Sequence, residues 1–124
     1  MNTTDKQIAK EIAQTIVSQI GGMSLGVAGW HKAAYLPAYS NGIRGGVTAL
    51  IGDHGSEQYH RITIELSVLD LYDIEITTLD GEPVKEYWGA YADQISELVE
   101  HASYVPHEMW LAQQDAKHAQ EQMA

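Results

Sequence analysis

Apolar and polar residues alternate most regularly in the middle of the chain. Residues 61–68 have an apolar side chain at every second position, which is the period of a strand with one buried face. Residues 72–77 repeat the pattern, with Asp73 and Glu75 on the polar side. Asp80 and Gly81 form a turn signal that typically joins antiparallel strands. The pattern therefore predicts an antiparallel meander with one face exposed to water.

Three shorter runs predict further strands. Residues 47–51 and 84–88 are short and mainly apolar or aromatic. Residues 35–39 indicate an edge strand, because Pro37 within them is tolerated only at an edge or a bulge. Asn41 and Gly42 form a turn signal after this run. Taken together, we expect a sheet of about four strands.

Helical periodicity appears at both ends of the chain. Ile8, Ile12, Ile16 and Ile20 recur every fourth residue, which predicts an amphipathic helix ended by the glycine pair 21–22. The spacing of apolar residues predicts two C-terminal helices, at residues 91–101 and 107–123. The second has a thin apolar stripe, so whether it packs on its own domain stays open. A length of 124 residues fits one domain, residues 1–124, and we expect an α+β fold with these helices around the meander.

The charge balance narrows the classes of partner. The chain has 17 acidic and 7 basic residues, giving a net charge of −10, and residues 71–124 alone carry −9. We therefore expect no direct contact with nucleic acid or with an anionic membrane through a basic surface. Charged residues near the N-terminus do not fit a secretory signal, so we expect a cytoplasmic protein. The absence of cysteine excludes disulfides and thiolate metal sites.

Two separated motifs resemble a family of small accessory proteins from phages and other mobile elements. The first is Ile8-Ala9, Ile12, Ile16, Gln19 and Gly21-Gly22; the second is Asp70-Leu71-Tyr72 followed by Tyr91-Ala92-Asp93-Gln94-Ile95. The resemblance spans most of residues 8–100, with Ile95 where the family has leucine. It implies the context of a mobile element. It supplies no catalytic signature and no site residues.

The acidic second half carries the main binding hypothesis. Asp73 and Glu75 share the wet side of one predicted strand, and Asp93, Glu97 and Glu100 share one face of a predicted helix. Such carboxylates would steer and hold a basic partner. We therefore expect a non-enzymatic binding protein, without cofactor or metal, that occludes a basic host protein or nucleoprotein complex, such as one of host defence. Plain solubility is the alternative explanation of the same charge.

Aromatic residues carry a second hypothesis. Trp30, Tyr35 and Tyr39 cluster in a glycine-rich segment of low charge, where they would line a small-molecule pocket or an oligomer interface. Because the chain has no phenylalanine, Trp and Tyr must also fill the core. Trp88 and Tyr91 bracket the expected junction between sheet and helix.

A metal-dependent enzyme is the third class. His54, Glu57 and His60 are spaced to converge where a loop enters a strand. The plainer interpretation is two turn residues and one solvent-facing strand residue. No HExxH or phosphate-loop motif occurs in the sequence.

Overall fold

The computed structural model describes residues 3–37, 43–52 and 59–102. Two consecutive helices, α1 (Thr3–Ile20) and α2 (Gly22–Ala28), come first. Five strands follow: β1 (His31–Leu36), β2 (Ile43–Gly52), β3 (Tyr59–Ser67), β4 (Tyr72–Thr77) and β5 (Pro83–Ala90). A 3₁₀ turn, η1 (Ala92–Gln94), leads into α3 (Ile95–Ala102).

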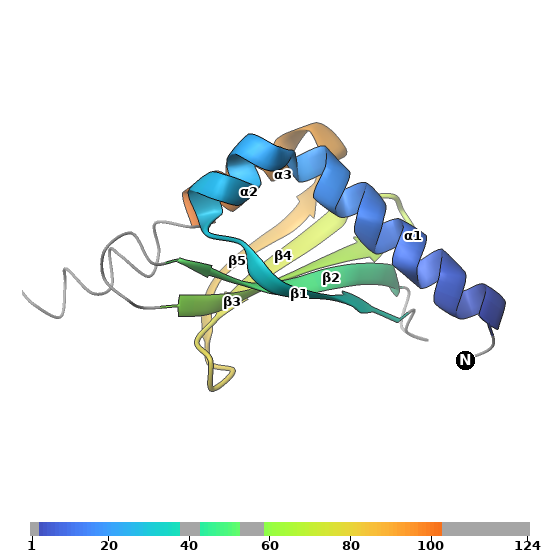
Figure 1. Cartoon of the computed structure of the whole chain (residues 1–124), viewed down its shortest axis with the longest axis horizontal. Coiled ribbons are helices and arrows are strands. Elements are labelled where there is room, and N and C mark those ends of the chain that lie inside the picture. Colours follow the sequence, from blue (N-terminus) through green and yellow to red (C-terminus); the bar gives the residue numbers. More distant parts are fainter. Residues whose placement is uncertain (1–2, 38–42, 53–58, 103–124) are drawn as a thin grey trace, which may run out of the picture.

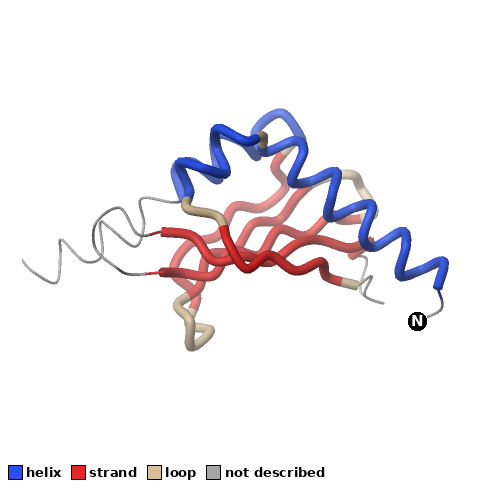
Figure 2. The backbone as a smooth tube through the Cα atoms, viewed as in Figure 1, coloured by secondary structure: helices blue, strands red, loops and turns tan. Residues whose placement is uncertain are grey.

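The strands form one antiparallel sheet in the order β1-β2-β3-β4-β5. Figure 1 shows α1, α2 and α3 on the same face of this sheet, and Figure 2 shows the resulting layers of helix and strand. The turn between β4 and β5 projects away from the helices (Figure 1, yellow). The predicted α+β class and meander are confirmed. The expectation of about four strands was too low, because the run near Tyr35 begins at His31 and forms a full edge strand.

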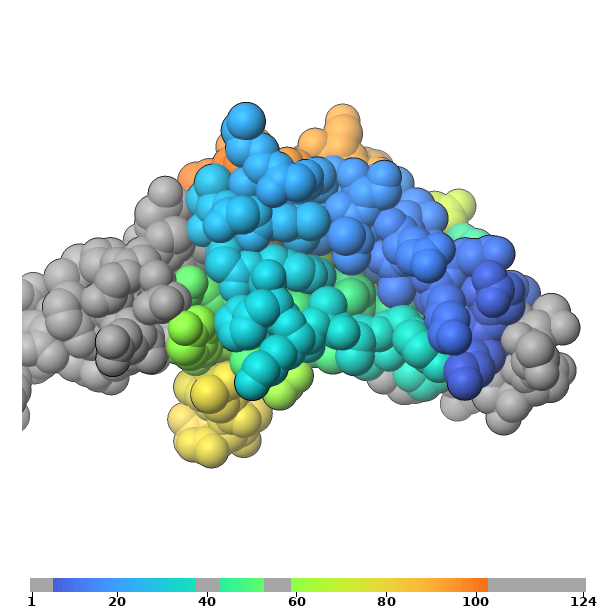
Figure 3. Space-filling model, in the orientation of Figure 1, coloured from blue at the N-terminus to red at the C-terminus, as the bar shows by residue number. Residues whose placement is uncertain are grey.

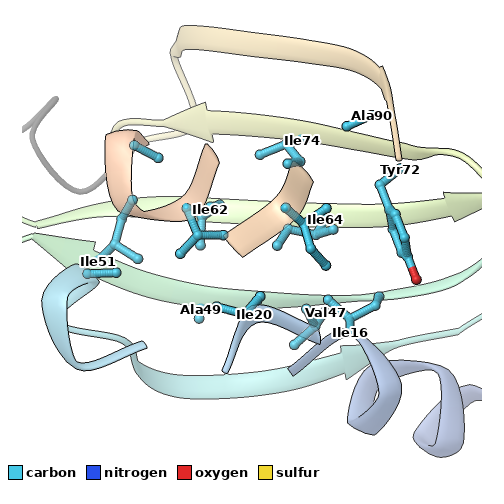
Figure 4. Close-up of a cluster of buried hydrophobic side chains, with 14 of the residues drawn as sticks. Ile16, Ile20, Val47, Ala49, Ile51, Ile62, Ile64, Tyr72, Ile74 and Ala90 are labelled. Carbon is cyan, nitrogen blue, oxygen red and sulfur yellow. The ribbon is translucent and has the colours of Figure 1, made fainter. Parts of the chain in front are cut away.

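The core lies between the sheet and the helical layer. Alternation along β3 and β4 turns Ile62, Ile64, Ile74 and Ile76 toward the helices, and all four are fully or almost fully buried. They meet Ile16 and Ile20 of α1 (Figure 4). Ile95 and Val99 of α3 belong to the same buried cluster. Each buried side chain of this size contributes about 1.5–3 kcal/mol relative to an exposed one. The helices are therefore held to this face by the isoleucines that the alternation predicts.

Hydrogen bonds connect the helical layer to itself and to the sheet. Ser24 of α2 donates to Oε1 of Glu100 on α3 at 2.8 Å, and its hydroxyl lies 2.7 Å from that of Ser96. The Tyr72 hydroxyl donates to Gln19 of α1 at 2.7 Å. These contacts satisfy polar groups at the edge of the core.

Two local expectations were wrong in detail. Val68 is 64% exposed because β3 ends at Ser67, where the chain turns toward β4 with Asp70 at φ +60°. Ile8 is 47% exposed, and it lines a hollow between α1 and the sheet together with Leu66 and Tyr72. The expected end of the first helix at the glycine pair is confirmed, and α2 starts at once from Gly22, with Gly21 at φ +84° at the corner.

Some expectations fall outside the described residues. These are the turn at Asn41 and Gly42 and the helix at residues 107–123. Among the helices that the structure describes, none is long and apolar enough to cross a membrane.

Candidate functional site

Four carboxylates lie on the sheet face opposite the helices. Because Tyr72, Ile74 and Ile76 point to the helical layer, Asp73 and Glu75 between them point the other way. The strand register adds two partners: Glu65 of β3 lies directly opposite Asp73, and Glu86 of β5 lies directly opposite Glu75. We call Glu65, Asp73, Glu75 and Glu86 the acidic sheet face. None of the described helices covers it (Figure 2).

The acidic sheet face has an unfavourable electrostatic environment. Like charges directly opposite on neighbouring strands are destabilising, and this face contains two such pairs in succession. Burial raises the pKa of Glu65 above its usual value, and the charges of Asp73 and Glu75 raise it further. Oδ1 of Asp73 accepts a hydrogen bond from the Gly89 N–H at 2.9 Å. Within the described residues, none of the ion pairs includes one of these four carboxylates, although Arg61 lies on the same side of β3 as Glu65. The face therefore concentrates negative charge.

Trp88 stands at the edge of this face, on the outermost strand. The pairing of β4 with β5 is irregular between Tyr72 and Ile74, and Gly89 adopts φ +71° there. This bulge follows Tyr87, which packs against the core, and leaves Trp88 66% exposed. Trp88 lines one hollow of about 430 Å³ together with Glu86, and a second of about 390 Å³ with residues of α3. A large exposed tryptophan beside carboxylates is typical of a protein-binding surface.

The five carboxylates expected from the sequence do not form one surface. Asp73 and Glu75 lie on the acidic sheet face, whereas Asp93, Glu97 and Glu100 belong to η1 and α3 in the helical layer. Glu100 accepts a hydrogen bond from Ser24 and so helps to join α2 to α3. Glu97 is exposed, with an oxygen 3.7 Å from Nε2 of His101. The helix carboxylates therefore face a different environment from the sheet carboxylates.

The structure places two of the three expected pocket aromatics, Trp30 and Tyr35, and these two do not line one pocket. Trp30 and Tyr35 are partly buried against the core, and Tyr39 lies outside the described residues. Tyr35 lines a groove of about 490 Å³ between α1 and β1, which run side by side in Figure 3, but Trp30 does not. The groove is mainly apolar, and the amine of Lys10 lies 5.8 Å from the centre of the Tyr35 ring.

The expected metal residues can be placed only in part. His54 and Glu57 lie outside the described residues. His60 is not a solvent-facing strand residue, since it is 5% exposed on the helix side of β3. Burial lowers the pKa of His60, and the Tyr59 backbone opposes this to a smaller extent. Among the residues that the structure describes, no group of three or more potential ligands could hold a metal ion.

Sequence reasoning missed Glu65, Glu86 and the position of Trp88. Glu65 occupies a polar position of the alternating run 61–68, so alternation already placed it on a sheet face. Glu86 follows another polar residue, Lys85, so alternation did not decide its side. The missing step was the pairing that sets them opposite Asp73 and Glu75. Comparisons with protein-family models, with curated proteins and with solved structures found no match to this chain.

Proposed function

We propose that this chain is a non-enzymatic protein-binding domain whose acidic sheet face docks on a basic surface of a partner. The observation that carries the proposal is the pair of directly opposed carboxylates, Glu65 with Asp73 and Glu75 with Glu86. Neutral residues at these positions would stabilise the sheet, so a destabilising arrangement is expected where binding requires it. A cationic partner would remove the repulsion on docking.

The partner would be a protein or nucleoprotein complex with an exposed basic surface. The net charge of −10 repels nucleic acid and speeds the approach of a cationic surface. Trp88 at the edge supplies apolar contact area, which charges alone do not provide. The resemblance to accessory proteins of mobile elements favours a host complex that handles nucleic acid, and occlusion of its binding groove would inhibit it.

Affinity capture with matched variants tests this function. The Glu65→Gln/Glu75→Gln variant removes two charges from the acidic sheet face. Its control, Asp80→Asn/Glu82→Gln, removes two charges from exposed positions at the β4–β5 turn. We expect wild type and control to retain the same basic proteins from a bacterial lysate at about 0.1 M salt, and the sheet variant to lose them. Binding should weaken at about 1 M salt, where charges are screened beyond about 3 Å. Equal retention by both variants would overturn the proposal.

The groove between α1 and β1 supports a second candidate, a binding site for a small apolar molecule. Its volume of about 490 Å³ lies in the range of ligand pockets, and Ala13, Val17, Tyr35 and Val47 supply apolar walls. A ligand that binds only the folded state raises the melting temperature. We expect compounds that raise the melting temperature of the wild type to have no effect on an Ala34→Leu variant. Ala34 is an exposed residue of β1 that lines the groove, so a leucine there would narrow it. Hits that persist in that variant would bind elsewhere.

A further inference from the structure

A hollow of about 390 Å³ lies between β5 and α3, beside the acidic sheet face. Trp88 and Ala90 of β5 line it on one side, and Glu97, Leu98 and His101 of α3 line it on the other. We call it the β5–α3 hollow. It joins an aromatic ring, a carboxylate and an apolar wall in one depression.

The two main binding groups of this hollow are accessible to a partner. Trp88 is 66% exposed, and the Glu97 side chain is 78% exposed. Nε2 of His101 lies 3.7 Å from an oxygen of Glu97, which is too long for a direct hydrogen bond. Glu97 therefore retains capacity to accept hydrogen bonds from an incoming donor.

An aromatic face beside a carboxylate is the environment that a guanidinium group prefers. The flat guanidinium stacks on an aromatic ring and donates two parallel hydrogen bonds to a carboxylate, and its carbon stem packs on apolar surface such as Leu98. The same strand already has a cation over an aromatic ring, since the Lys85 amine lies 5.4 Å from the centre of the Tyr87 ring. Lysine has no planar group to stack and donates from a single point.

The hollow also adjoins the acidic sheet face. Trp88 lines the neighbouring hollow with Glu86, so one aromatic side chain separates the sheet carboxylates from Glu97 on α3. A partner seated on the sheet would therefore reach the hollow around the edge of β5.

We propose that the β5–α3 hollow binds an arginine side chain of the partner, stacked on Trp88 and paired with Glu97. The arginine is taken to belong to the same basic partner, so the inference rests on the proposed function. The acidic sheet face then supplies general attraction, and the hollow supplies selection of arginine over lysine. The sequence predicted that Glu97 and Asp73 both bind the partner. In this proposal Glu97 binds it from a different side of the molecule than Asp73 does.

Labelled peptides provide the test. Fluorescein-labelled hexa-arginine and hexalysine carry equal charge, and hexacitrulline has nearly the shape of hexa-arginine without charge. Fluorescence anisotropy at about 0.1 M salt measures each affinity for the full chain. We expect wild type to bind hexa-arginine about threefold to tenfold more tightly than hexalysine, as expected for one stacked cation. Hexacitrulline should not bind measurably.

Variants of the hollow should change the arginine preference rather than binding in general. Trp88→Leu should bring the two affinities to within about a factor of two, and Trp88→Phe should restore part of the difference. Glu97→Gln should weaken hexa-arginine more than Glu82→Gln, which removes an equal charge from the β4–β5 turn. A preference that survives Trp88→Leu, or equal effects of Glu97→Gln and Glu82→Gln, would overturn the proposal.

The same peptides separate this proposal from the proposed function. If only the hollow assignment is wrong, Glu65→Gln/Glu75→Gln will weaken both charged peptides equally and the variants of the hollow will have no selective effect. If only the role of the acidic sheet face is wrong, that variant will bind like its Asp80→Asn/Glu82→Gln control. Trp88→Leu will still abolish the arginine preference in that case.

Discussion

Glu65 shows at the scale of one residue how the fold creates an electrostatic cost. It is partly buried, it lies directly opposite Asp73, and Glu75 is close enough to raise its pKa. A carboxyl group whose pKa is raised by folding binds protons more readily in the folded state. Its repulsion is therefore fully present above that raised pKa and is relieved as the pH falls through it.

Replacing Glu65 should stabilise the protein in a pH-dependent manner. We expect Glu65→Gln to increase the free energy of unfolding by about 0.5 kcal/mol at pH 7, because it removes a like-charge pair. The gain should shrink near pH 4, where wild-type Glu65 is protonated. Urea unfolding at the two pH values measures this difference. Glu82→Gln serves as the control, and an equal gain there would show that total charge, rather than the pair, is responsible.

His60 should make the protein sensitive to mild acid. Burial lowers its pKa from the usual value of 6.5, so the unfolded chain binds the proton first as the pH falls. We expect stability to decrease from pH 7 toward pH 5, with a limiting slope of about 1.4 kcal/mol per pH unit for one proton.

Urea midpoints across this range test the assignment to His60. His60→Leu should flatten the dependence, whereas His101→Gln removes an exposed histidine and should preserve it. An unchanged slope in His60→Leu would assign the acid sensitivity to other groups.

At the scale of secondary-structure elements, the close approach of β2 and β3 requires glycine at position 46, because a larger residue would collide with β3. A Cβ on Gly46 would lie 2.2 Å from the Ile64 carbonyl oxygen, so the two central strands would have to separate locally. By contrast, a Cβ on Gly22, at the start of α2, would meet nothing within 4 Å.

These two glycines form a matched pair for thermal unfolding. We expect Gly46→Ala to cost about 2 kcal/mol or more, because backbone must move. Gly22→Ala should be neutral or slightly stabilising, because it restricts the unfolded chain without a clash. Circular dichroism melts compare both with wild type. A mild effect of Gly46→Ala would mean that the strands can separate at little cost.

At the scale of the whole molecule, the carboxylates also act against self-association. None of the described helices covers the acidic sheet face, and an uncovered sheet face can pack against a second copy. Like charges oppose that packing. The sequence left a homo-oligomer open.

Neutralising the acidic sheet face should therefore promote self-association. We expect Glu65→Gln/Asp73→Asn/Glu75→Gln/Glu86→Gln to sediment faster than wild type as protein concentration rises. The control variant Glu11→Gln/Asp80→Asn/Glu82→Gln/Asp93→Asn removes the same charge from exposed positions elsewhere. Sedimentation velocity distinguishes the two. Identical behaviour would show that this face does not govern association.

Local pattern was sufficient for β3 and β4 and for the side that most of their residues face. The period of two placed Asp73 and Glu75 opposite Ile74, and the fourfold spacing of isoleucines identified the buried stripe of α1, except Ile8. Both follow from backbone geometry that repeats over a few residues. The alternation predicted the wrong side for Val68, because the turn that ends β3 depends on a positive φ at Asp70.

Tertiary structure alone decided how the charges are distributed over the molecule. Register placed Glu65 and Glu86 against the carboxylates of β4, and packing of α3 on the isoleucine side removed Glu97 and Glu100 from that surface. The bulge at Gly89 exposed Trp88 between the acidic sheet face and α3. Pairing and packing join residues far apart in the chain, so their energies depend on all elements together. Alternation within one strand determined the acidic side of β4, and the assembled sheet determined what lies beside it.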